Sequence, residues 1–188
     1  MSGASDPLTW ADDLGLALEE VSLWPRHPKD VSRRRIADGP RVDPRSKPGP
    51  IGAWNRVFDP GQAIAEFELP YDLKERGPTE DRYNYEGTDS GPGGIHNKRD
   101  GMFISFHGSD PLRRVTDKPV NSFDLVRIHL FGELDEGMPD DAPIRMLPSQ
   151  KAMLDFARAN EEVADAMQAE ADAEIDRYVA MLDEEDEA

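Results

Sequence analysis

The amino-acid sequence predicts an α+β fold in which a small antiparallel β-hairpin or three-stranded sheet packs on a helix, with a long acidic helix near the C-terminus. Three observations lead to this prediction. Polar and apolar residues alternate between residues 82 and 107, where Gly-rich and Asp-Gly turns separate the alternating runs. Residues 121–132 carry an apolar stripe at helical spacing. Residues 149–182 combine apolar residues at helical spacing with many acids.

The composition limits the size of the core and the kind of partner. Of the 188 residues, 37% are hydrophobic and 32% are charged, and the net charge is -17. Since globular domains have roughly 45–50% apolar residues, only part of this chain is expected to bury a core. An acidic surface repels phosphate, which argues against bare duplex DNA as the partner of the whole chain and favours basic partners.

The sequence also favours a cytoplasmic location and no membrane contact. It contains no cysteine, so disulfides and cysteine-bound metals are impossible. No stretch approaches the roughly 20 apolar residues of a membrane span. Residues 1–20 contain acids but neither lysine nor arginine, unlike the start of a signal peptide.

Residues 1–50 are predicted to form a short helix and a basic, proline-rich linker. The apolar residues between 8 and 24 fit an amphipathic helix. Six prolines then interrupt residues 25–52, which carry eight basic and three acidic residues. Two interpretations of this segment stay open. The segment is either an arm that contacts phosphates or a solvated connector. The charge of such a connector would keep it extended, or would pair with the acidic tail.

The predicted sheet belongs to a small α+β domain, residues 51–135. Three runs fit strands, namely residues 82–86, 95–97 and 102–107. Asp100-Gly101 is a strong hairpin signal between the last two runs. In the third strand, alternation places Phe103, Ser105 and His107 on one face and Met102, Ile104 and Phe106 on the other.

Two helices are predicted in the same domain. Asp59 can cap a short helix over residues 59–68, which Pro70 ends. A better-defined helix begins at a cap formed by Asn121 or Ser122, and Gly132 is expected to stop it.

Residues 136–188 are predicted to contain an acidic loop and then the long helix. Ser149 can cap this helix, which is expected to run to about residue 182. From Ser149 onwards the chain has thirteen acids and three bases. This region is therefore expected to bind a basic protein partner.

Neither a catalytic motif nor a cofactor is predicted. The sequence has no phosphate loop, dinucleotide-binding turn or nucleophile elbow. His96, His107 and Asp110 could supply three ligands to zinc or manganese, as in a metal-dependent nuclease. The alternative is two surface histidines on a hairpin and a turn-forming aspartate. Ser105, His107 and Asp110 also have the residue types of a hydrolytic triad, but no oxyanion hole is predicted near them.

Four aromatic residues lie on the predicted sheet: Tyr83, Tyr85, Phe103 and Phe106. Such residues can stack single-stranded bases, helped by the neighbouring Arg82, Lys98 and Arg99. The alternative is ordinary packing of the sheet against the helix at 122–131. Because the sheet needs one buried face, at least half of the aromatic residues are expected in the core.

Several short motifs together resemble one family. They are Arg82-Tyr83-Asn84-Tyr85, Gly93-Gly94, Asp100-Gly101-Met102-Phe103, Ser105 to Pro111, Asn121 to Arg127, Phe131-Gly132, Leu134-Asp135, Leu147-Pro148-Ser149 and Lys151-Ala152-Met153. Over roughly residues 50–165 the combination resembles the middle region of phage and prophage primase–helicase proteins, the virulence-associated protein E family. The hairpin followed by a Phe-Asp-Leu-Val helix also resembles the zinc-binding domain of bacterial primases. A zinc-ribbon-like fold without zinc is therefore expected.

The resemblance implies a function in replication without enzymatic activity, since this sequence contains neither the primase-like domain nor the helicase-type ATPase of the family. The chain is then a non-catalytic accessory module that binds single-stranded DNA or a replication protein. The residues expected to contact nucleic acid are Arg82, Tyr85, Lys98, Arg99, His107 and Arg127. The alternative function is an acidic interaction factor, or a DNA mimic that inhibits a host nucleic-acid enzyme.

The resemblance also carries over four single residues: His107, Asp110, Asn121 and Asp124. Helix capping explains Asn121 and Asp124 on physical grounds. The family commonly has two adjacent histidines where this chain has Phe106-His107, so a role that needs both histidines is not expected.

Overall fold

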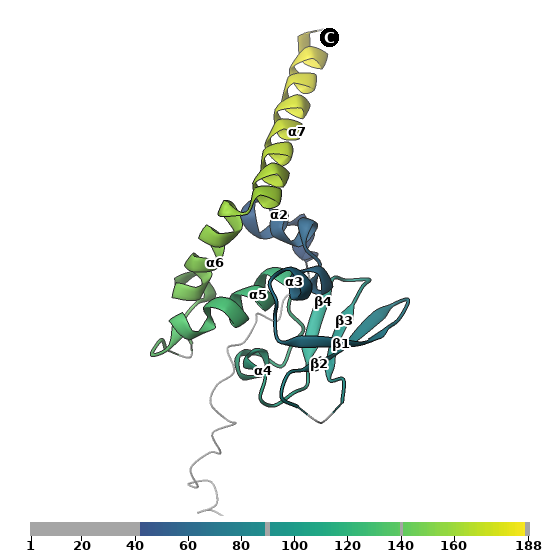
Figure 1. Cartoon of the computed structure of the whole chain (residues 1–188). Coiled ribbons are helices and arrows are strands. Elements are labelled where there is room, and N and C mark those ends of the chain that lie inside the picture. The colour runs from purple at the N-terminus through teal and green to yellow at the C-terminus, as the bar shows by residue number, and fades with distance from the viewer. Residues whose placement is uncertain (1–41, 89–90, 140, 187–188) are drawn as a thin grey trace, which may run out of the picture. The chain divides into compact units, whose positions relative to one another are not determined.

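The computed structural model describes residues 42–88, 91–139 and 141–186. The predicted helix at 8–24 and most of the basic linker lie outside these residues. The described chain is a mixed α and β structure with a four-stranded antiparallel sheet and several helices, the last of which is long (Figure 1). In this part of the chain, no helix is both long enough and apolar enough to cross a membrane.

Helices precede and follow the sheet in the sequence. Those before it are the 3-10 helix η3 (Pro44–Ser46), α2 (Gly49–Val57) and α3 (Pro60–Glu66). Those after it are α4 (Pro111–Val115), α5 (Ser122–Phe131), the 3-10 helices η4 (Gly132–Asp135) and η5 (Ile144–Met146), α6 (Pro148–Ala159) and α7 (Glu161–Asp186).

The sheet is a meander with strand order β1-β2-β3-β4. Its strands are β1 (Tyr71–Arg76), β2 (Glu80–Tyr85), β3 (Gly94–Asn97) and β4 (Met102–Ser105). The prediction of three strands is wrong by one, because β1 was missed. Only Tyr71 is buried in this edge strand, and the charged residues that follow it hide the alternation that marks a strand.

One face of the sheet is buried, and it includes both apolar and polar residues. Tyr83 and Phe103 are core residues, while Phe106 is 58% exposed on the other face. Asp81 lies opposite His96, and His96 lies opposite Phe103. Alternation therefore brings Asp81 and His96 to the buried side together with the aromatic core.

Helix α5 begins and ends as predicted, and Asn121 caps it by accepting a hydrogen bond of 2.9 Å from the Asp124 N–H. Gly132, however, does not stop the chain in a left-handed conformation. Its φ of -60° is helical, and the chain continues directly into η4. Two backbone hydrogen bonds between Phe103 and Val120 fix the entry of α5 against β4.

Helix α2 was not predicted, because its first turn belongs to the proline-rich segment. Pro50 lies in that first turn, where a missing N–H costs nothing and the fixed φ suits a helix. Trp54 is fully buried, and its indole N–H donates to the Ser122 hydroxyl over 3.1 Å. The prolines at its start are therefore the reason that α2, which contributes Trp54 to the core, was not predicted.

The predicted C-terminal helix is interrupted, which corrects the expectation of one helix from 149 to 182. Asn160 adopts an extended conformation between α6 and α7, and its side chain accepts from the Val163 N–H over 3.1 Å. Asn160 therefore caps α7. Met153 and Val163 join the same hydrophobic core as Trp54, so α6 and the start of α7 are part of the folded body.

Candidate functional site

A cavity of about 680 Å³ lies between η3, α2 and α3 on one side and the buried face of the sheet on the other, at the end of that face where Asp81 lies. We call it the basic pocket. Its charged lining residues are Arg45, Arg56, Asp59, Arg76, Asp81 and Lys98. Four bases and two acids therefore meet in a chain whose net charge is -17.

Lys98 and Asp81 form the strand side of the basic pocket. The Lys98 ammonium lies 2.8 Å from an oxygen of Asp81 and donates to the Gly77 carbonyl over 2.8 Å. The same aspartate accepts from the Gly77 N–H over 3.2 Å. Burial acts to raise the pKa of Asp81, but Lys98 and the Gly77 N–H outweigh it and hold that pKa below its usual value.

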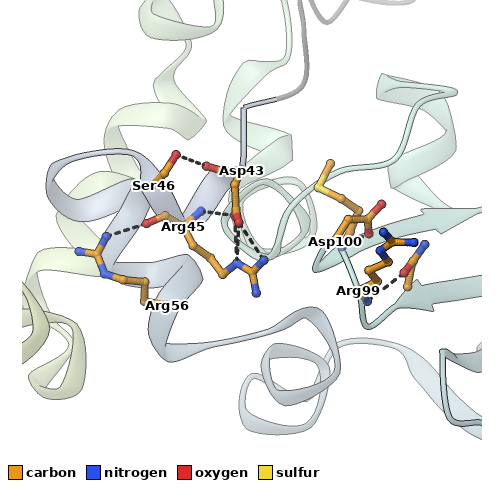
Figure 2. Close-up of polar contacts among 8 residues, drawn as sticks. Asp43, Arg45, Ser46, Arg56, Arg99 and Asp100 are labelled. Atoms are coloured by element: carbon orange, nitrogen blue, oxygen red, sulfur yellow. Dashed lines mark hydrogen bonds and ion pairs between the residues drawn. The ribbon is translucent and has the colours of Figure 1, made fainter.

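Arg45 and Arg56 form the helical side. Arg45 makes an ion pair of 2.8 Å with Asp43, and its guanidinium extends toward the β3–β4 turn that contains Arg99 and Asp100 (Figure 2). Arg56 donates to the Arg45 carbonyl over 2.7 Å and pairs with Glu170 at 2.8 Å. These contacts hold two guanidinium groups at the edge of the cavity.

Arg76 is the least constrained base of the pocket. It is exposed at the end of β1, and in the described part of the chain its side chain makes no hydrogen bond or ion pair. A ligand that pairs with this guanidinium therefore displaces no hydrogen bond or ion pair to the described residues.

His96 and Tyr83 lie on the inner side of the same cavity. His96 is 3% exposed, and neither of its ring nitrogens has a hydrogen-bond partner among the described residues. Burial lowers the pKa of His96 against the opposing effect of Asp59 and Asp81. Burial also raises the pKa of Tyr83 to about 12. Both rings are therefore neutral near pH 7.

A second group of polar side chains lies at the other end of the buried sheet face. The Tyr71 hydroxyl donates to Asp110 over 2.5 Å and lies 2.9 Å from Nε2 of His129. Asp110 also caps α4 by accepting from the Leu112 N–H over 2.8 Å. Burial, and then Asp110, raise the pKa of Tyr71, while burial lowers the pKa of His129. Asp110 is fully buried, so this network stabilises the fold and offers no access to a substrate.

The structure does not assemble the predicted metal or triad residues. His96 pairs with Phe103 across the ladder, whereas His107 lies beyond the opposite end of β3 and accepts from the Gly93 N–H over 3.0 Å. No three potential metal ligands converge within the described ranges. His96 and His107 are buried, not surface-facing as the alternative interpretation had them.

The six residues expected to contact nucleic acid occupy very different positions. Lys98 lines the basic pocket, and Arg99 is exposed in the next turn. Arg82 pairs with Glu80 at 2.6 Å, and alternation places it on the face away from the pocket. Tyr85 is partly buried against the Tyr71 ring.

The other two of the six residues are structural. His107 is 4% exposed and its Nε2 accepts from two backbone N–H groups, those of Gly93 and Tyr85. Arg127 is 3% exposed and lies 3.0 Å from Asp124 and 2.9 Å from the Ser149 hydroxyl. Burial leaves neither side chain a surface for a phosphate, so we do not assign them to a binding site.

Most of the basic pocket was not predicted from the sequence. Arg56 and Arg76 were not singled out, and Arg45 was counted only as part of a linker. Two signals pointed to this pocket. The excess of bases in residues 25–52 supplies Arg45, and the predicted nucleic-acid contacts beside the sheet aromatics include Lys98. Of those aromatics, Tyr83 lines the pocket but is buried, and Phe103 is a core residue.

The chain was also compared with known proteins. It matches no family model, no curated protein and no solved structure.

Proposed function

We propose that this chain is a non-catalytic accessory module of phage-type DNA replication, and that it binds single-stranded DNA at the basic pocket. The observation that carries the proposal is the convergence of Arg45, Arg56, Arg76 and Lys98 on one cavity in a strongly acidic chain. The replication context rests on the family resemblance of residues 50–165.

Phosphate contacts explain this pattern of charge. A single strand presents one phosphate per nucleotide, and each neutralised phosphate releases counterions. Arg76 and Arg99 are exposed and have no ion pair among the described residues, so they can take phosphates directly. Arg45 and the exposed Lys47 come from the described end of the basic segment 25–52.

A single strand suits this surface better than a duplex. The acids elsewhere on the chain repel a wide, highly charged duplex, whereas a flexible strand can keep to the basic edge. Tyr83 is 4% exposed and therefore does not offer a stacking surface. The binding is expected to depend on phosphates and to show little base preference.

The experiment is a titration of the full chain against a fluorescently labelled oligothymidylate, followed by anisotropy from about 50 to 200 mM salt. The logarithm of the binding constant should fall linearly with the logarithm of salt concentration, with a slope of about -0.7 per phosphate contact. The variant Arg76→Ala/Arg99→Ala should bind more weakly, and its slope should be shallower by about 1.4.

The matched control is Arg145→Ala/Lys151→Ala. These two bases are also exposed and without an ion pair in the described residues, but they belong neither to the pocket lining, as Arg76 does, nor to the β3–β4 turn beside it, as Arg99 does. The proposal fails if the chain does not bind the oligonucleotide at the lowest salt concentration, or if the control variant weakens binding as much as Arg76→Ala/Arg99→Ala does.

A further inference from the structure

The second half of α7 carries a group of exposed apolar side chains. Their exposed fractions are 60% for Ile175, 63% for Tyr178, 49% for Val179, 63% for Met181 and 45% for Leu182. Ile175, Tyr178, Val179 and Leu182 follow the i, i+3, i+4, i+7 spacing, so they share one face of the helix. We call these four residues the α7 stripe.

Nothing in the described body of the protein covers this stripe. The first turns of α7 pack on α2 and α6, where Val163 is buried and Glu170 pairs with Arg56 (Figure 1). From residue 171 to residue 182 every residue is exposed. A helical segment without tertiary packing is only marginally stable in water, so a bound partner would stabilise it.

The charge around the stripe decides which partner fits. Helix α7 has eleven acids and one base, Arg177. Glu174 and Asp176 are both exposed close to the stripe. A second copy of this helix would bring acids against acids, which is unfavourable, and an anionic membrane would repel it. A basic helix with its own apolar face would match both the apolar stripe and the acids.

We propose that residues 171–182 of α7 dock a basic amphipathic helix of a partner protein, with the α7 stripe as the apolar contact and the flanking acids as the charged rim. The sequence alone suggested a partner surface over the whole of residues 149–188. The structure narrows it, because α6 and the first turns of α7 belong to the core. This proposal is independent of DNA binding at the basic pocket.

The test uses the full chain and a synthetic peptide of three heptads, with Leu at the a and d positions and Lys at the e and g positions. The peptide should bind in a saturable one-to-one complex by isothermal titration calorimetry. The variant Ile175→Ser/Leu182→Ser keeps the net charge and should weaken binding by about tenfold or more. A peptide with Glu in place of each Lys should not bind.

The matched control is Ala173→Ser/Ala180→Ser. These alanines lie on the opposite face of α7, and the control introduces the same two serines into the helix. It should bind the peptide like the original chain. Equal weakening by both variants, or no binding of the Lys peptide, would overturn the proposal. So would a dimer of the chain, seen by light scattering, that the stripe variant dissociates, because the partner would then be a second copy.

Discussion

His107 and His96 lie on the same buried face of the sheet, but their hydrogen bonding differs completely. They are 4% and 3% exposed. Nε2 of His107 accepts from the backbone N–H groups of Gly93 and Tyr85, where the β2–β3 ladder has ended. Both ring nitrogens of His96 lack a partner in the described structure, and His96 lies beside the basic pocket. Burial alone therefore does not show whether a polar residue serves the fold or faces a ligand cavity.

The largest expected effect comes from the end of the sheet at which the buried polar groups of Tyr71, Asp110 and His107 are hydrogen-bonded. Asp110→Ala removes the acceptor of the Tyr71 hydroxyl, the partner of His129 and the cap of α4. Because these groups are buried, we expect a loss of about 3–5 kcal/mol in the free energy of unfolding, measured by urea denaturation. The control Asp59→Ala removes an exposed helix cap at the pocket end and should cost about 1 kcal/mol. Equal losses in the free energy of unfolding would show that the buried polar groups at the Asp110 end stabilise the fold no more than the exposed cap at the pocket end.

Exchange of each histidine for leucine tests the comparison directly. His107→Leu leaves two backbone N–H groups without an acceptor and should cost about 2–4 kcal/mol. His96→Leu removes two unbonded nitrogens, so its free energy of unfolding should stay within about 1 kcal/mol of the original chain. The same urea experiment compares the two variants. A larger loss for His96→Leu would mean that a hydrogen bond to His96 is present in solution.

Local signals in the sequence were sufficient for much of the fold. The caps of α3 and α5 could be predicted because Asp59 and Asn121 act on N–H groups only three residues away. The Asp100-Gly101 turn between β3 and β4 is equally local. Strand β1 and helix α2 lacked such signals, since four of the six residues of β1 are charged and α2 begins among prolines.

The candidate site depends on contacts that no local pattern encodes. Arg56 reaches the carbonyl of Arg45 and the carboxylate of Glu170, which is 114 positions away in the chain. Arg127 looked like a surface base on a helix, but Asp124 and Ser149 hold it in the interior. A charged residue in a sequence can be a ligand contact or a buried structural pair, and only the fold distinguishes them.

A change in pH tests the contributions of His96, beside the basic pocket, and of His129, in the Tyr71–Asp110 network, to the stability of the fold. Burial lowers the pKa of His96 and of His129 in the folded chain. The unfolded chain, with histidine pKa values near 6.5, then binds more protons below that pH. Their contribution to stability is present above pH about 6.5 and is lost as the pH falls below it, by up to about 1.4 kcal/mol per pH unit for each histidine.

Unfolding measured by urea at pH about 7.5 and about 5.5 should therefore show a loss of about 1–3 kcal/mol. The variant His96→Leu should lose roughly half as much, because only His129 then contributes. A variant with unchanged pH dependence would show that the pKa of His96 is the same in the folded and the unfolded chain.

The smallest expected effect on stability comes from the ion pair between Lys98 and Asp81 in the basic pocket. The Lys98 side chain is 35% exposed, so solvent screens this pair, and Lys98→Met should cost about 1 kcal/mol or less at neutral pH.

In the Lys98→Met variant the pKa of Asp81 should rise, because its main charged partner is gone while the Gly77 N–H remains. A depressed carboxyl pKa contributes stability above its unfolded value of about 3.9 that is lost as the pH falls, so the variant should show a shallower loss in acid. Nuclear magnetic resonance titration of the Asp81 carboxyl checks the shift. Lys98 follows His96 by two positions at the end of β3 and also lowers the pKa of His96, so the same titration should find the His96 pKa raised. If both values stay unchanged, Lys98 does not control the charge of the pocket.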